Sequence, residues 1–255
     1  MDIKKHINNV KRNGISFIPN LISKKDCKFY KKKSLRLIQM YKKLKKPLST
    51  HNQVINSPFR YEKSFYKLIY NIKLDKILQK LVDKNYVLIN SNILNRAIDK
   101  DIKVSHRTIG DGWHTDTPSV GGEKKLNGFR FLVAIMLDDF TEKNGCTYYI
   151  PKSHLNNKIP IRNKRYKYKK LTGKSGDAII FDSSLWHKGG ESTAQTRLSI
   201  ISLYGPWWIK PYFNYEKMLG KNNLKKLNNK VRKLLHYNST PPRCIEERMN
   251  TVTKY

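Results

Sequence analysis

The chain has 255 residues, of which 38% are hydrophobic and 11% aromatic, so it can bury a substantial core. It contains no apolar run long enough to span a membrane, and its opening residues, Met1 to His6, lack the apolar segment of a signal peptide. The three cysteines are widely spaced and odd in number, which fits neither a disulfide framework nor a zinc ribbon. These features predict one domain, residues 1–255, in the reducing cytoplasm.

The formal net charge is +33, from 52 Lys and Arg residues against 19 Asp and Glu residues. A charge of this size would suit a nucleic-acid surface. Lysine, asparagine and isoleucine are all abundant, as A/T-rich codons would produce, and the lysines are spread over the whole chain. A codon-biased surface is therefore the simpler interpretation. In either case the surface should attract anions, and the attraction should weaken with salt.

The N-terminal part is predicted to be mostly helical. Ile15–Ile18 reads as a short strand, and Ser23 then caps a helix that runs to about Lys45. Residues 46–60, which contain two prolines, are expected to form a loop. Residues 62–83 carry apolar side chains at helical spacing and predict a further helical segment, in one or two pieces.

From residue 86 the pattern changes to that of short strands. Strands are expected at 86–94, 102–108, 129–137, 146–150, 178–181 and 197–204. Short strands wrapped by helices at both ends predict a mainly β fold with flanking helices and a jelly-roll core. The single domain then has a helical N-terminal part at 1–85, a core at about 86–210 and a helical C-terminal extension at 211–255.

The segment Trp113-His114-Thr115-Asp116 contains a candidate metal site. In an extended strand, residues i and i+2 point to the same face, so His114 and Asp116 project side by side. A histidine from another strand would complete a 2-His-1-carboxylate set, which leaves coordination positions open on Fe(II). His-x-Asp alone is a weak signal in a chain with seven histidines, so the surrounding residues have to support it.

His187, at the end of an apolar strand, is the candidate second histidine; the alternative is a packed or surface imidazole. Arg197 begins the next apolar strand, where a charged side chain should be paired. Its fork of donors suits a bidentate grip on a carboxylate, which would belong either to a ligand or to a structural acid of this chain. Ser199 shares the face of Arg197 and could add a hydroxyl to the same carboxylate.

Several further stretches accompany these residues in a fixed order. They are Asn13-Gly14-Ile15-Ser16-Phe17-Ile18-Pro19-Asn20-Leu21-Ile22-Ser23, Trp113-His114-Thr115-Asp116, Asn144-Gly145-Cys146-Thr147, Ile150-Pro151-Lys152-Ser153-His154, Gly176-Asp177-Ala178-Ile179-Ile180-Phe181, Trp186-His187 and Arg197. Together they resemble the phytanoyl-CoA dioxygenase family of Fe(II)- and 2-oxoglutarate-dependent oxygenases. The resemblance covers about residues 12–210, and the order of several motifs makes it specific where any one motif would not be.

The resemblance implies a double-stranded β-helix, a cupin-like variant of the jelly roll, with iron held by His114, Asp116 and His187. The co-substrate 2-oxoglutarate would chelate the iron through its keto acid end, and its far carboxylate would meet Arg197. Thr117 matches a position that touches 2-oxoglutarate in relatives. The implied reaction consumes O2, converts 2-oxoglutarate to succinate and carbon dioxide, and hydroxylates an unactivated C–H bond of the substrate.

The sequence departs from the family pattern at two positions. Lys152 stands where many members have glycine before the Ser-His pair, and Gly189 stands where some members have a serine two residues after the distal histidine. Some contacts to 2-oxoglutarate can therefore differ. Asp116 is retained, whereas related halogenases lack this carboxylate, so the resemblance favours hydroxylation over halogenation.

The substrate is the part of the function that the sequence leaves open. The segment Arg162–Lys170 has six basic residues in nine; it either recognises an anionic group of a small or carrier-linked molecule, such as a phosphate, a carboxylate or a coenzyme A moiety, or is a solvated loop. Two other classes remain: the same iron chemistry on nucleic acid, and a non-catalytic jelly-roll binding protein with a vestigial triad. Nothing in the sequence indicates an obligate protein partner.

Overall fold

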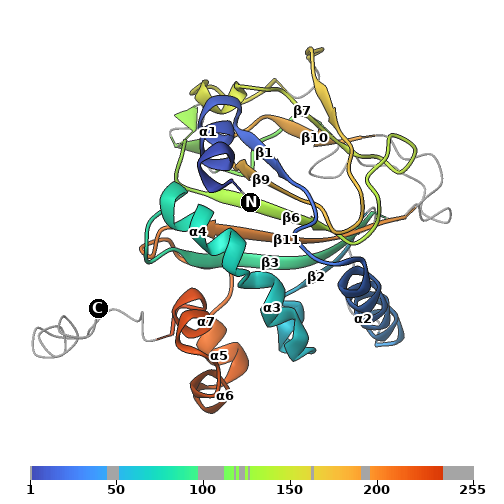
Figure 1. Cartoon of the computed structure of the whole chain (residues 1–255), viewed down its shortest axis with the longest axis vertical. Helices are drawn as coiled ribbons and strands as arrows, with labels where there is room; N and C mark the ends of the chain where they lie inside the picture. The colour runs from blue at the N-terminus through green and yellow to red at the C-terminus, as the bar shows by residue number, and fades with distance from the viewer. Residues whose placement is uncertain are drawn as a thin grey trace, which may run out of the picture.

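The structure is a computed structural model, and it describes residues 2–44, 52–96, 112–117, 119–120, 124–125, 127–161, 164–190 and 196–237. Its largest element is a six-stranded antiparallel sheet with the strand order β1-β9-β6-β11-β3-β2 (Figure 1). The strands are β1 (Ile15–Ile18), β2 (Asn52–Asn56), β3 (Val87–Arg96), β6 (Phe131–Met136), β9 (Ala178–Asp182) and β11 (Arg197–Gly205). The two longest strands, β3 and β11, are neighbours, so the first strand of the jelly-roll region pairs with the last strand of that region.

A smaller sheet packs against one face of the larger one. Its order is β10-β7-β8, from β10 (His187–Gly189), β7 (Thr147–Tyr149) and β8 (Lys169–Leu171), and a bridge between His114 and His187 extends its edge. A separate short pair joins β4 (Ser119–Val120) to β5 (Lys124–Lys125). From β3 onward the chain passes back and forth between the two main sheets, which is the jelly-roll arrangement that the sequence predicts.

The larger sheet is buried on both faces, as β6 illustrates. Alternate residues from Phe131 face a core shared with the helices, and alternate residues from Leu132 face a second core between the two sheets. Every residue of β6 is buried, as is every residue of its neighbour β9. Burial on both faces explains why these strands are continuous apolar runs rather than alternating ones.

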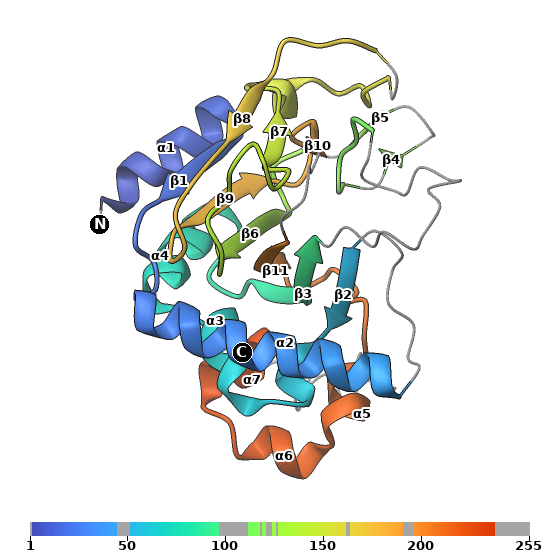
Figure 2. The same cartoon turned by 90° about the vertical axis from the view of Figure 1, so that its right-hand side faces the viewer.

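Helices cover the outer face of the larger sheet (Figures 1 and 2). They are α1 (Ile3–Asn13), α2 (Lys24–Lys43), α3 (Tyr66–Ile69), α4 (Ile72–Leu81), α5 (Tyr215–Leu219), α6 (Lys221–Lys225) and α7 (Asn229–Leu234), with short 3-10 turns at Pro58–Arg60, Lys63–Phe65 and Ser153–Leu155. The Ser23 hydroxyl accepts a hydrogen bond from the backbone N–H of Asp26 at 3.0 Å. The capping pattern in the sequence therefore sets the true start of α2.

The structure differs from the sequence prediction at two places. Part of the loop expected at 46–60 is the edge strand β2, which pairs with β3 although only Val54 and Ile55 in it are apolar. The helical segment expected at 62–83 in one or two pieces is divided before α4, where Asn71 caps the new helix by accepting from Lys73 N–H. Helix α1 is an element that the sequence pattern does not predict.

The C-terminal extension is helical as far as the structure describes it. Leu224 of α6 and Val231 and Leu234 of α7 pack into the core on the helical side of the larger sheet. The strand expected at 102–108 and the last residues of the extension, 238–255, lie outside the described residues. In the part of the chain that is described, no helix combines the length and apolar character needed to cross a membrane.

Gly14 offers a test of the packing between α1 and the site-bearing turns. It ends α1 with φ +81°, and a Cβ there would lie 2.6 Å from both Nδ1 of His154 and Cδ1 of Leu185. Gly128 has φ +75°, but no atom of the residues that the structure describes lies within 4 Å of its Cβ position. We expect Gly128→Ala to lower the free energy of unfolding by about 1–2 kcal/mol through backbone strain alone. Gly14→Ala should lower it by roughly 1–3 kcal/mol more, because the added methyl group overpacks the site.

Urea denaturation of both variants measures this difference in the free energy of unfolding. Equal losses for Gly14→Ala and Gly128→Ala would contradict the packing around Gly14.

Candidate metal centre and co-substrate site

His114 and His187 lie opposite each other in an antiparallel bridge. The backbone N–H of each donates to the carbonyl of the other, and both N···O distances are 3.0 Å. Residues that are paired directly in this way carry their side chains on the same face, and the two ring centroids are 4.3 Å apart. The backbone pairing alone therefore brings the two imidazoles together.

Asp116 reaches the same point through Ser183. The Ser183 carbonyl accepts the backbone N–H of Asp116 at 2.8 Å and that of Thr117 at 3.1 Å. The Asp116 carboxylate then lies 3.4 Å from Nε2 of His187 and 3.9 Å from Nε2 of His114. One ligand atom from each of the three residues lies within 4.8 Å of the others, so the structure gathers the whole predicted metal set.

Each imidazole is oriented by a carbonyl of its own segment. Nδ1 of His114 lies 2.9 Å from the Gly112 carbonyl, and Nδ1 of His187 lies 2.9 Å from the Leu185 carbonyl. A carbonyl can only accept, so Nδ1 carries a hydrogen in both rings, and Nε2 is the ring atom that faces Asp116. Bonds of this kind fix the tautomer of metal-binding histidines. Two such nitrogens and one carboxylate fit Fe(II) with positions left open.

An aromatic cluster supports the two histidine segments from outside. Trp113 precedes His114 and Trp186 precedes His187, and the ring of Tyr166 lies against both tryptophans, at centroid distances of 5.7 and 5.4 Å. Tyr168 adds a contact to Trp113 at 5.8 Å. Tyr166 is half-buried and Tyr168 is exposed, and their ring contacts hold the basic segment beside the candidate metal ligands.

Arg197 occupies a buried position on the inner face of β11, with 4% of its surface exposed. Its Cζ lies 4.1 Å from the ring centroid of Phe140, and Nη1 donates to Oγ1 of Thr147 at 3.5 Å. Its Nε is buried and has no hydrogen-bond partner among the described residues. Among the described residues, no carboxylate lies within 4.0 Å of this guanidinium, so the structural acid considered above is not found there.

The electrostatics of Arg197 favour an anionic ligand. Burial, and secondarily the nearby charge of Arg96, lower the pKa of Arg197 to about 9. The charged form is therefore held in surroundings that penalise it. A carboxylate that reaches this guanidinium would both neutralise the charge and satisfy the orphaned Nε.

The hydroxyls predicted to touch the co-substrate have protein partners. The Ser199 hydroxyl donates to the Leu94 carbonyl at 3.5 Å, on the same inner face as Arg197. Oγ of Ser183 lies 2.6 Å from Oγ1 of Thr117, and Thr117 is buried. Thr117 thus also secures the Asp116 segment, while the contact of either hydroxyl with 2-oxoglutarate stays a prediction.

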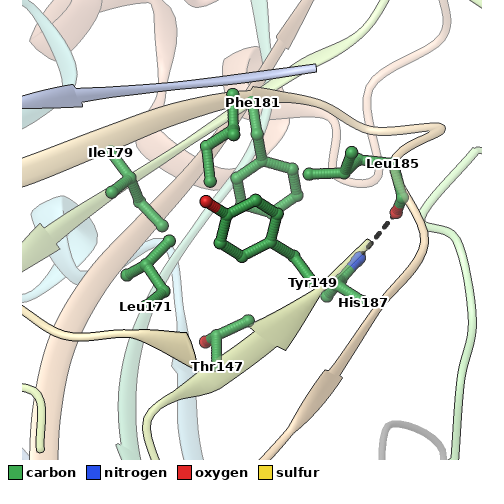
Figure 3. Close-up of a pocket in the computed structure, with 8 residues that line it drawn as sticks. Thr147, Tyr149, Leu171, Ile179, Phe181, Leu185 and His187 are labelled. Carbon is green, nitrogen blue, oxygen red and sulfur yellow. Dashed lines mark hydrogen bonds between the residues drawn. The ribbon is translucent and has the colours of Figure 1, made fainter. Parts of the chain in front are cut away.

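A small pocket adjoins His187 between the sheets (Figure 3). Thr147 and Tyr149 line it from β7, and Tyr149 is paired with His187 across the strands. Burial raises the pKa of Tyr149, so its hydroxyl keeps its proton and can donate to an anion. Tyr149, Phe140 and Arg96 are not among the site residues predicted from the sequence. The signal that could find Tyr149 is its two-residue spacing from Thr147, which places both side chains on one face of β7.

Comparison with known proteins identifies the family. The model of the phytanoyl-CoA dioxygenase family matches residues 10–199, so the chain belongs to this family, as its motifs indicate. Protein Rv1501 of Mycobacterium tuberculosis and Mb1539 of Mycobacterium bovis are each 30% identical over 116 residues, 43% of this chain. The match spans 40% of the length of these relatives.

Solved structures share the fold. HygX from Streptomyces hygroscopicus, with nickel and 2-oxoglutarate bound, aligns with a TM-score of 0.64 at 16% identity over 82% of this chain and 89% of its own. The epimerase SnoN from nogalamycin biosynthesis, in complex with Fe3+, alpha ketoglutarate and nogalamycin RO, aligns with a TM-score of 0.62 at 14% identity over 89% and 90%. The predicted mainly β jelly roll with flanking helices is confirmed.

The carboxylate of the triad can be tested by its charge. We expect Asp116→Asn, which keeps the shape but removes the anion, to weaken Fe(II) binding at least roughly tenfold, the lower limit for losing even an outer partner of a metal ligand. Asp139→Asn is the matched control, because Asp139 bonds Lys174 and the Ser175 N–H on the surface. Equilibrium Fe(II) titration under argon measures both, and equal affinities in the two variants would argue against Asp116 as a ligand.

Proposed function

We propose that this protein is an Fe(II)- and 2-oxoglutarate-dependent dioxygenase that hydroxylates an unactivated C–H bond of a small or carrier-linked, anionic substrate, with release of succinate and carbon dioxide. The observation that carries the proposal is that the chain has both a preformed triad of candidate metal ligands and a buried arginine. His114, Asp116 and His187 converge within 4.8 Å, and Arg197 lies buried without an acid among the described residues. Family membership supports the same reaction class.

The residues divide the work of the site between them. His114, Asp116 and His187 would hold the iron on one face, leaving the other face to the co-substrate and oxygen. When bound, the iron supplies the oxidation of the C–H bond at the expense of 2-oxoglutarate and O2. Arg197 orients the far carboxylate of 2-oxoglutarate, and Phe140 shields that contact from water by stacking on the guanidinium. Tyr149 is placed to donate to the same molecule.

A small-molecule substrate fits the fold and the charge. HygX, which shares the fold, has been crystallised with hygromycin B, and SnoN with nogalamycin RO. In this chain Lys164, Arg165 and Lys167 are exposed on the segment that Tyr166 anchors beside the triad. Cations held at this place would favour an anionic group on the substrate.

Anaerobic spectroscopy tests the reaction class. Adding Fe(II) and then 2-oxoglutarate to metal-free protein should produce the weak visible charge-transfer band of an iron-chelated keto acid. Admitting O2 should then release succinate and carbon dioxide even without a substrate, though slowly. His187→Ala should show neither the band nor the products. A wild-type protein without a band at saturating iron and 2-oxoglutarate would support the non-catalytic binding protein instead.

The preference for an anionic substrate is tested by removing four positive charges from the basic segment and, in a control, the same number from another part of the surface. We expect replacement of Lys164, Arg165, Lys167 and Lys169 by Gln to weaken binding of coenzyme A, a probe for carrier-linked acids, at least roughly tenfold in a calorimetric titration at fixed salt. The control replaces four exposed lysines of α2, Lys25, Lys28, Lys32 and Lys43, by Gln. Equal losses in both variants would show that only the overall charge attracts the probe.

A further inference from the structure

A second arginine lies beside Arg197 on the inner face of the larger sheet. Arg96 is the last residue of β3 and is paired directly with Arg197 of β11. Directly paired residues in antiparallel strands point to the same face, with Cβ atoms about 4.5–5.5 Å apart. Arg197 contacts Phe140 and Thr147 between the sheets. The side chain of Arg96 therefore also leaves its strand on the face that points between the sheets.

Gly189 locates the far end of the Arg96 side chain. A Cβ built on Gly189 would overlap Nη1 of Arg96 and would lie 3.0 Å from its Cζ. Gly189 is two residues after His187 in β10 and therefore shares its face, and it is paired with Thr147, which accepts from Arg197. The Arg96 guanidinium thus fills the position that a Gly189 side chain would take.

The two guanidinium charges destabilise each other in this position. Like charges directly opposite in a sheet repel, and the charge of Arg96 contributes to the lowered pKa of Arg197. Strand pairing and the room at Gly189 keep them together. A carboxylate bound between them would neutralise the buried charge of Arg197 and reduce its repulsion with Arg96, and Arg forks are the side chains best shaped to share one carboxylate.

We propose that Arg96 and Arg197 together clamp the far carboxylate of 2-oxoglutarate, and that Gly189 is needed because any side chain there would displace Arg96. The inference rests on the proposed function, since it assigns a second residue to the same co-substrate. It also explains the departure from the family pattern at Gly189, where some members have serine. Here a guanidinium replaces the hydroxyl that such a serine would offer.

Binding selectivity for the far carboxylate tests the clamp directly. The keto acid band gives dissociation constants for 2-oxoglutarate and for 2-oxopentanoate, which has the same chain and keto acid but no far carboxylate, on Fe(II)-loaded protein without oxygen. We expect Arg96→Met to weaken 2-oxoglutarate binding roughly ten- to a hundredfold and to leave 2-oxopentanoate binding unchanged. Arg197→Met should show the same selective loss, and Arg60→Met, on an exposed arginine, should change neither.

Gly189 adds a double-mutant test. Gly189→Ala should weaken 2-oxoglutarate binding by about the same factor as Arg96→Met. In the Arg96→Met background, Gly189→Ala should have little further effect, because the side chain that it displaces is already gone. Additive losses would mean that Gly189 acts independently of Arg96 and would contradict the clamp.

Two results overturn the clamp while leaving the proposed function in place. In one, Arg96→Met weakens both keto acids equally, as a general disturbance of the site would. In the other, 2-oxoglutarate binding is unchanged, which would assign Arg96 to the primary substrate or to the scaffold. Failure of the wild-type protein to bind 2-oxoglutarate would instead overturn the proposed function together with the clamp.

Discussion

The turn that follows β9 is the constraint on which the metal site depends. Its Ser183 carbonyl fixes Asp116, and its Leu185 carbonyl fixes the imidazole of His187. The turn is itself held by Asp182, whose carboxylate accepts from the Ser184 N–H and from Gly128 N–H. The bridge between His114 and His187 then completes the triad. The three candidate ligands are thus positioned by backbone hydrogen bonds, which would orient the site before any metal binds.

At the proposed co-substrate site, the buried charge of Arg197 is unfavourable for stability. Burial and the neighbouring charge of Arg96 both penalise the charged form of Arg197. A dicarboxylate that binds there, as we propose, would stabilise the folded state by binding it selectively. The chain has a net charge of +33 and attracts anions over much of its surface. The two arginines would provide a specific binding position for one of them.

The sequence predicts what short-range patterns determine. The buried runs of β6 and β9 and the Ser23 cap follow from periodicity and local chemistry. His114 and Asp116 do converge, but from an isolated bridge and a bend that Ser183 holds rather than from the strand that the sequence predicts. Strand β2 could not be predicted in this way, because its residues become a strand only by pairing with β3. The position of Arg96 could not be predicted either, because it depends on the β3–β11 register and on the space at Gly189. Such long-range pairings have no local signature in a single sequence.

One crystallographic measurement tests the site most directly: anomalous scattering at the iron edge from crystals grown anaerobically with Fe(II) and 2-oxoglutarate. We expect one iron peak about 2.0–2.2 Å from Nε2 of His114, Nε2 of His187 and a carboxylate oxygen of Asp116, the usual range for such metal–ligand bonds, with continuous density from the iron to Arg197. An iron peak elsewhere, or 2-oxoglutarate directed away from Arg197, would contradict the site described above.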